Sequence, residues 1–330
     1  APLTAWCVSR PIVRRGPSLS DAHRNLLRKL ACRTWYFFET FVSAKENWLP
    51  PDNFQEVPQP MIATRTSPTN LSFGLTTCLA AWDFGYISTE RMLERLERML
   101  DAMERLDRYR GHFFNWYDTR TLKPLPPRYV SSVDSGNLAA GLVTLRSGLL
   151  EVCDTPAYGA QLWNGIRDTL MVVAEEAAGA TSPDFIALLR ETELVLVVAP
   201  SDPSEAGDYL ASLEKLTLRL AERATAEGID GASLWCRFLF QLCRDHLERS
   251  SRFATPQGVR LTLRQLARDG AEEGATPEAV QLASDLVKRA EALAERCSEM
   301  RRAMEFGFLY NHDRELLHIG FDADARRLDP

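Results

Sequence analysis

The sequence lacks the features that define several large classes of protein. No run of 18 or more apolar residues occurs in its 330 residues, so we expect no membrane-spanning helix. The first residues contain no long apolar stretch followed by a small-residue cleavage site, and we therefore expect no signal peptide. The glycine-rich GxGxxG motif, the P-loop and the GxSxG motif are absent as well. Nucleotide binding and serine hydrolase chemistry are therefore without support.

Cysteine and histidine are present, but not at the spacing that metal sites need. The chain has seven cysteines and five histidines, and no CxxC pair occurs among them. The pattern predicts neither a zinc site nor a dithiol redox site. We expect most of the cysteines to be small apolar residues of the core, in a reducing compartment. No metal and no cofactor is predicted.

The charge is unevenly distributed. The net charge is -6, yet residues 1–33 carry seven basic residues against Asp21, a local charge of +6. An acidic body argues against nucleic acid as a partner, because phosphate binding needs a basic face. A basic leader on an acidic body suits a membrane-proximal cytoplasmic segment, and it equally suits a solvated linker.

The remaining composition is that of a soluble globular protein, with 45% hydrophobic and 25% charged residues. Helical periodicity predicts helices over residues 20–43, 67–82, 88–109 and 135–152, and a series of helices over 155–305 that ends with 277–304. Serine or threonine, often followed by proline, marks five helix starts: Ser20, Ser67-Pro68, Ser88, Ser182-Pro183 and Thr276-Pro277. Two apolar runs around a polar turn predict a β-hairpin over residues 306–321.

Two long loops, over residues 45–67 and 110–134, interrupt the helical pattern. Loops of this length in a compact chain are usually functional. Both join helices at corresponding turns, so we expect them to converge at one end of the helices. Their composition mixes aromatic residues with polar and charged ones. Sugars need this mixture, because their C–H faces stack on aromatic rings and their hydroxyls pair with acidic, amide and guanidinium groups.

The candidate ligand contacts come from these loops and from the adjoining helix ends. Each also has a structural interpretation, as a core cap or a turn residue; the Asp134–Asn137 run, for example, makes a good N-cap. The predicted substrate-binding residues are Trp48, Asp52, Asn53, Glu56, Arg65, Asn70, Asp83, Tyr86, Asn115, Trp116, Tyr117, Asp118, Tyr129, Ser132, Asp134 and Asn137.

The same stretches carry a family resemblance. The segments Asn47–Glu56, Arg65–Asn70, Asn115–Arg120 and Tyr129–Leu138 resemble the middle domain of the bacterial cyclic β-1,2-glucan synthases. The opening Leu3–Trp6 and Ser9–Pro11 and the Phe306–Ile319 hairpin resemble it too, whereas residues 155–300 match mainly in helical character.

The resemblance implies a fold and an activity. Those synthases are large inner-membrane proteins, and their middle domain is a glucoamylase-like (α/α)6 toroid that cyclises linear β-1,2-glucan by transglycosylation. We therefore expect an all-α fold: a partial toroid with a helical insertion and one small β-hairpin. The implied domains are a basic juxtamembrane linker over 1–18, the first toroid helices over 19–154, the insertion over 155–305 and a returning hairpin over 306–330.

The implied partners are a β-1,2-glucan chain and the remaining domains of the same large polypeptide. The resemblance also places the chain at the cytoplasmic face of the inner membrane, beside the membrane through its N-terminal linker. The family's catalytic glutamate motifs have no match here, so we expect the catalytic pair beyond Pro330 and an inactive isolated fragment. The alternative hypothesis is a non-catalytic helical scaffold or interaction module that docks through residues 155–300.

Overall fold

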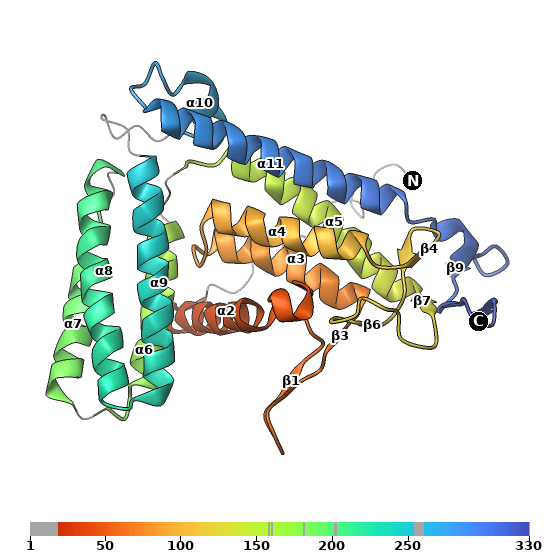
Figure 1. The fold of residues 1–330 in the computed structure, drawn as a ribbon, viewed down its shortest axis with the longest axis horizontal. Helices are drawn as coiled ribbons and strands as arrows, with labels where there is room; N and C mark the ends of the chain where they lie inside the picture. The colour runs from red at the N-terminus through yellow and green to blue at the C-terminus, as the bar shows by residue number, and fades with distance from the viewer. Residues whose placement is uncertain are drawn as a thin grey trace, which may run out of the picture.

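The computed structural model describes residues 19–157, 159, 161–180, 182–200, 203–253 and 261–329. Most of these residues lie in α-helices, and the strands are short and antiparallel (Figure 1). The predicted all-α class is confirmed. Antiparallel helix pairs are also the arrangement that a partial (α/α)6 toroid requires. The predicted linker over residues 1–18 lies outside the described residues.

The first helices are α2 (Asp21–Phe41), α3 (Pro68–Asp83), α4 (Thr89–Glu104) and α5 (Ser132–Cys153). Each begins after a serine whose side chain accepts a hydrogen bond from the backbone N–H three residues on; these serines are Ser20, Ser67, Ser88 and Ser131. The starts predicted for α2, α3 and α4 are confirmed. Helix α5 starts three residues earlier than predicted, and Asp134 lies in its first turn.

A second group of helices runs across the first. Its members are α6 (Gln161–Glu176), α7 (Pro183–Val197), α8 (Pro203–Ala226) and α9 (Asp230–Arg252), and α10 (Leu263–Asp269) follows. Figure 1 shows α7, α8 and α9 side by side, with axes roughly perpendicular to those of α3 and α4. The predicted start at Ser182 is confirmed, because its hydroxyl accepts from the backbone N–H of Phe185.

Helix α11 (Pro277–Arg302) returns to the first group and lies along α4 and α5. Arg289 donates to Glu97 of α4 at 2.7 and 2.8 Å, and Arg146 of α5 donates to Ser298 at 3.0 Å. The domain boundaries given above remain a prediction, but α11 packs with the first helices.

The structure corrects the end of the third predicted helix. Helix α4 stops at Glu104, and Arg108–Tyr109 (β4) pairs with His112–Phe113 (β5) instead of continuing the helix. The two turn residues, Arg110 and Gly111, both have positive φ angles, of 49° and 77°. A two-residue turn of this kind matches the twist of a hairpin, which explains why the helix gives way to strands.

The predicted C-terminal hairpin is present in a shorter form. Residues Phe306–Leu309 form a 3-10 helix (η2), and the hairpin pairs β8 (Tyr310–Asn311) with β9 (Leu316–Leu317). The strand β10 (Gly320–Asp322) instead lies between β7 (Tyr129–Ser131) and β11 (Arg327–Asp329). The C-terminal strands are therefore joined to the second long loop.

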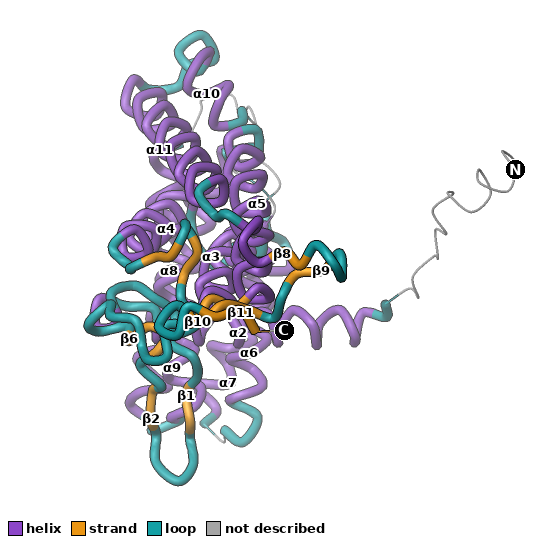
Figure 2. Tube along the Cα trace, turned by 90° about the vertical axis from the view of Figure 1, so that its right-hand side faces the viewer, coloured by secondary structure: helices purple, strands orange, loops and turns teal. Residues whose placement is uncertain are grey.

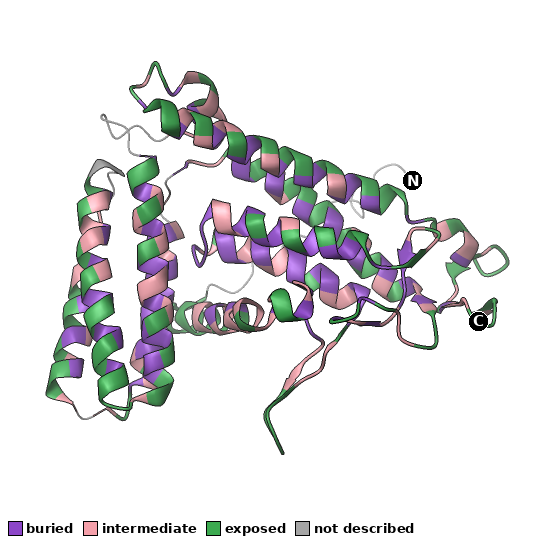
Figure 3. Cartoon of the chain, in the orientation of Figure 1, coloured by how far each residue is buried: buried purple, intermediate pink, exposed green. Residues whose placement is uncertain are grey.

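The core runs through the inner faces of both helix groups, and the exposed residues lie on their outer faces (Figure 3). The six cysteines in the described part of the chain are free and buried, as the sequence predicted for most of them. Across the described ranges, no helix combines the length and the apolar composition that a membrane span needs.

Candidate functional site

The two long loops meet at the end of the helices where α3 and α5 begin (Figure 2). The first loop contains η1 (Ala44–Glu46), β1 (Phe54–Gln55), β2 (Met61–Ile62) and β3 (Arg65–Thr66). Strand β3 pairs with β6 (Tyr117–Asp118) of the second loop, so that Arg65 lies opposite Asp118. The predicted convergence of the loops is confirmed.

A polar cluster surrounds Asp52 at this junction. Arg65 donates two hydrogen bonds to Asp52 Oδ2, from Nε at 3.1 Å and from Nη2 at 2.9 Å. Asn70, in the first turn of α3, donates to Asp52 Oδ1 at 3.3 Å, and Asn53 donates to Oδ2 at 3.0 Å. The Arg65 guanidinium also lies over the Trp116 ring, 4.7 Å from its centroid. Five predicted residues thus form one group of polar and aromatic side chains.

A second cluster joins the first turns of α3 and α5. The hydroxyl of Thr69 donates to Asp134 Oδ1 at 2.6 Å, and Asn137 Nδ2 donates to the same hydroxyl at 3.0 Å. Thr69 precedes Asn70, so the two clusters are contiguous. Together they form a polar surface across the N-terminal ends of two neighbouring helices.

Asp118 belongs to a turn rather than to this surface. Its Oδ1 accepts from the backbone N–H groups of Thr121 and Arg120 and from the Thr121 hydroxyl. The hydrogen bond from the Thr121 backbone is the main cause that lowers the pKa of Asp118. A carboxylate held ionised in this way is poorly suited to donate a proton as a general acid.

Four other predicted residues use their hydroxyls within the protein. Tyr117 is fully buried and donates to the carbonyl of Asp107 at 2.6 Å. Tyr86 is buried as well and donates to Asp168 of α6 at 2.9 Å. Ser132 donates to the carbonyl of His318 at 2.5 Å, and Tyr129 donates to Asp329 at 2.8 Å; these two bonds tie the C-terminal strands to the second loop.

The remaining predicted residues lie apart from the clusters or contribute only through the backbone. Trp48 packs against α4, with the Arg98 guanidinium 4.3 Å from its ring centroid. Glu56 is exposed in the β1–β2 hairpin, which extends away from the helices. Asp83 is at the opposite end of α3, about 20 Å from Asn70 at 1.5 Å per residue. Asn115 donates its backbone N–H to Tyr129 at 2.6 Å.

Sequence reasoning missed two residues that hold the junction together. Thr69 links α3 to α5, and Glu46 is a buried carboxylate that accepts a hydrogen bond from the hydroxyl of Thr119. Thr69 lies inside the Arg65–Asn70 stretch, so its position next to Asn70 could have marked it. Nothing in the sequence around Glu46 indicates a partner more than 70 residues away.

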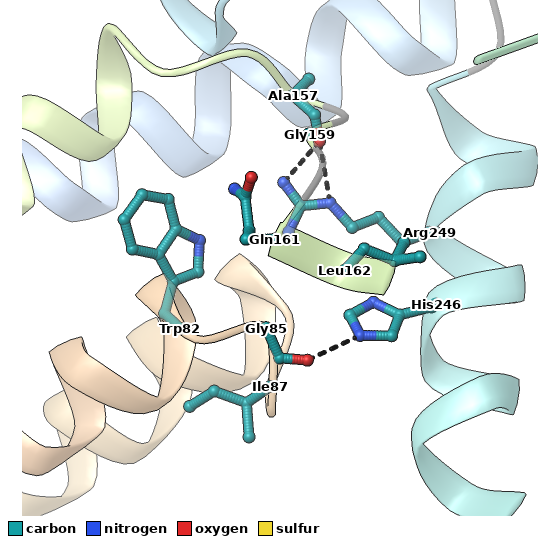
Figure 4. A pocket seen from close by; sticks show the side chains of 9 residues that line it. All are labelled: Trp82, Gly85, Ile87, Ala157, Gly159, Gln161, Leu162, His246 and Arg249. Atoms are coloured by element: carbon teal, nitrogen blue, oxygen red, sulfur yellow. Dashed lines mark hydrogen bonds between the residues drawn. The ribbon is translucent and has the colours of Figure 1, made fainter. Parts of the chain in front are cut away.

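A small cavity lies where α9 meets the turn between α3 and α4 (Figure 4). The Nε2–H of His246 donates to the Gly85 carbonyl at 3.0 Å, and Arg249 donates twice to the Ala157 carbonyl at 3.1 and 2.8 Å. Burial lowers the pKa of His246 to about 4, which keeps the ring neutral near pH 7. Arg249 also donates to the hydroxyl of Thr89 at the start of α4, at 2.7 Å, so these side chains join the two helix groups at this cavity.

The described residues contain no group of histidine, cysteine and acidic side chains placed to hold a metal ion. The loop junction offers amide and guanidinium donors and carboxylate acceptors beside an indole ring.

Comparison with known proteins agrees with the resemblance drawn from the loops. Along its whole length the chain is 33% identical, over 351 aligned positions, to the cyclic beta-(1,2)-glucan synthase NdvB of Rhizobium meliloti. The predicted resemblance is confirmed. The chain spans 11% of the length of that relative.

Two further comparisons concern protein-family models and solved structures. No protein-family model matches the chain. Among solved structures, a putative glucoamylase from Bacteroides fragilis is 20% identical with a TM-score of 0.34, and the match covers 53% of this chain and 43% of the other.

Proposed function

We propose that this chain is part of a carbohydrate-active enzyme of cyclic β-1,2-glucan synthesis. In this proposal its helices form part of an (α/α)6 toroid, and the loop junction lines part of the cleft in which a β-1,2-glucan chain is cyclised by retaining transglycosylation. Similarity to a cyclic beta-(1,2)-glucan synthase along the whole chain is the observation that carries the proposal. The polar and aromatic clusters at the starts of α3 and α5 provide a surface of suitable chemistry.

The junction residues are proposed to bind the glucan, not to cleave it. Retaining transglycosylation needs two carboxyl groups about 5 Å apart, one nucleophilic and one acting as acid and base. Asp52 accepts hydrogen bonds from Arg65 and Asn70, and Asp134 accepts one from Thr69. Asp118 accepts hydrogen bonds from the backbone of its own turn. Each carboxylate is therefore already engaged by donors of the chain. We propose that the catalytic pair comes from another part of the longer protein.

The proposal also includes the partners of the chain and its location in the cell. The remaining domains of one large polypeptide are the expected partners, and the cytoplasmic face of the bacterial inner membrane is the expected location. The structure offers a second explanation for part of the basic leader, because three of its residues form ion pairs with α6. Arg28 pairs with Asp168 at 2.7 Å, Lys29 with Glu175 at 3.1 Å, and Arg33 with Glu176 at 2.6 Å.

Titration of the chain with linear β-1,2-glucan oligosaccharides, followed by tryptophan fluorescence, tests the proposal. We expect saturable binding that Arg65→Ala and Asn137→Ala weaken. Asp83→Asn is the matched control, since Asp83 lies at the far end of α3 from the junction. An absence of binding, or equal losses in all three variants, would contradict a glucan surface at this place.

A second candidate function rests on a different surface. A groove lies between α2, α6 and α7. Its apolar lining comes from Leu170, Met171, Leu196 and Val197, and charged residues, among them Arg167 and Glu193, line it as well. Beside it Leu194 is 69% exposed, and Val197 itself is 77% exposed. Exposed apolar patches of this kind favour an interaction module, which would bind protein and leave the loop junction unused. Glucan binding that Arg65→Ala abolishes would decide against this candidate.

A further inference from the structure

A buried carboxylate lies behind the junction of the two loops. Glu46, the last residue of η1, is 3% exposed. The hydroxyl of Thr119 donates to its Oε2, and Nε of Arg120 lies 3.4 Å from its Oε1. Both donors belong to the turn that follows β6. A carboxylate is stable away from water only where hydrogen bonds replace its hydration, and this turn supplies them.

The next residue holds the same turn. Asn47 Nδ2 donates to the carbonyl oxygens of Thr119 and Arg120, at 2.8 and 2.9 Å. Asn47 and Trp48 both have left-handed backbones, with φ angles of 50° and 62°. Left-handed residues other than glycine persist where surrounding contacts fix them. Side-chain bonds from two successive residues therefore clamp residues 119 and 120 against the first loop.

The clamped turn is continuous with the Arg65–Trp116 pair. The backbone N–H of Thr119 donates to the Thr64 carbonyl at 3.1 Å, and Arg65 lies opposite Asp118 in the β3–β6 ladder. Trp116 is two residues before Asp118, under the Arg65 guanidinium.

We propose that Glu46 is a positioning residue, which holds the turn at 119–120 and thereby keeps Trp116 beneath Arg65. Its effect on ligand binding rests on the function proposed above, whereas its effect on Trp116 does not.

Fluorine NMR of the full chain labelled with 5-fluorotryptophan tests the proposal. The chain has seven tryptophans, and the signal that is lost in Trp116→Phe is the one from Trp116. We expect Glu46→Gln to move or broaden the Trp116 signal, with any further change confined to the neighbouring Trp48, while the signals of Trp35, Trp82, Trp163 and Trp235 stay in place. Asn47→Gly, which keeps the left-handed backbone but removes the amide, should have the same effect. Glu295→Gln, at an exposed carboxylate of α11 paired with Arg302, is the matched control.

An unmoved Trp116 signal in a folded Glu46→Gln chain would overturn the proposal. If that variant does not fold, Thr119→Val decides the question in the same way, because it removes a single donor. In the glucan titration we expect Glu46→Gln to raise the dissociation constant about tenfold through misplacement of the binding groups. A wild-type chain that binds no glucan would count against the proposed function, and the fluorine signals would still settle the role of Glu46.

Discussion

Two helix pairs in the first group, α4 with α11 and α3 with α5, are built in opposite ways. Helices α4 and α11 are rich in charge, and ion pairs cross between them, such as Arg296 with Asp101 at 2.7 Å and with Glu104 at 2.9 Å. Helix α3 has no charged residue before Asp83. It approaches α5 closely through Gly141, where a Cβ would lie 2.1 Å from the hydroxyl oxygen of Ser72.

The outer faces of the two pairs also differ in how many charged residues they carry. The exposed side of α3 and of the start of α5 carries apolar residues, Phe73 at 58% and Val133 at 68% exposure, whereas the later turns of α5 expose Arg146 beside α11. A helix that faces only water normally carries charges on its outer face, as α4 does. Under the proposed function, α4 and α11 form the solvent side, and α3 with the start of α5 forms the side that meets the glucan.

The largest expected effect comes from overfilling the α3–α5 contact. Gly141→Val should destabilise the chain by about 2–3 kcal/mol, because the added atoms must displace Ser72 and separate the helices. The same change at Gly136, which has open space around it on α5, should alter stability by less than about 0.5 kcal/mol. Urea denaturation of both variants checks this, and equal losses at the two sites would show that the helices are not in close contact.

Low pH should destabilise the folded chain near α3 and α5, because two buried histidines pack there. His246 contacts the turn after α3 and His112 contacts Ser135 of α5, at 2.9 Å from its Nδ1; burial lowers the pKa of both. The unfolded chain therefore takes up protons before the folded chain as the pH falls below about 6.5. Stability should be greatest above that pH and should fall as the pH drops towards 4, by up to about 3 kcal/mol for His246.

Free energies of unfolding measured between pH 7 and pH 5 test the histidine effect. His246→Gln should reduce the slope of stability against pH, because it removes a buried histidine whose pKa is lowered in the folded chain. His23→Gln, at an exposed histidine of α2, is the matched control and should leave the slope unchanged. Identical slopes in wild type and His246→Gln would contradict the effect.

High salt should weaken the ion pairs between α4 and α11, and its effect on stability should be small. Arg296→Ala should cost about 0.5–1 kcal/mol at low ionic strength, because its ion pairs with Asp101 and Glu104 are partly exposed. The cost should shrink towards zero in 1 M salt, where the screening length is about 3 Å. The loss caused by Gly141→Val should not change with salt. Thermal unfolding of both variants at two ionic strengths measures the difference, and a salt-independent cost for Arg296→Ala would argue against the ion pairs.

The sequence predicts local structure well where a single signal decides it. Ser67 followed by Pro68 marks the start of α3, and Thr276 followed by Pro277 marks the start of α11. The apolar periodicity of residues 88–109 predicts a helix that is too long at its C-terminal end. The left-handed turn at Arg110 and Gly111 overrides helical propensity there and forms a hairpin.

The candidate site is harder to predict, because its parts meet only in the folded chain. The aromatic and polar composition of the loops picked out Asp52, Arg65 and Trp116, which the structure brings together. Composition could not separate these residues from Tyr86, whose hydroxyl is used by Asp168 of another helix. The contact between Glu46 and Thr119 spans 73 residues of sequence, and no local pattern encodes it.

Hydrogen exchange of the chain with and without linear β-1,2-glucan tests the central claim most directly. If the loop junction binds the glucan, amide protection should rise around residues 63–70, 115–119 and 132–137, at the starts of α3 and α5. Helices α4 and α11 should exchange as before. Protection confined to α6–α9, or to the charged face of α4 and α11, would contradict a glucan surface at the loop junction.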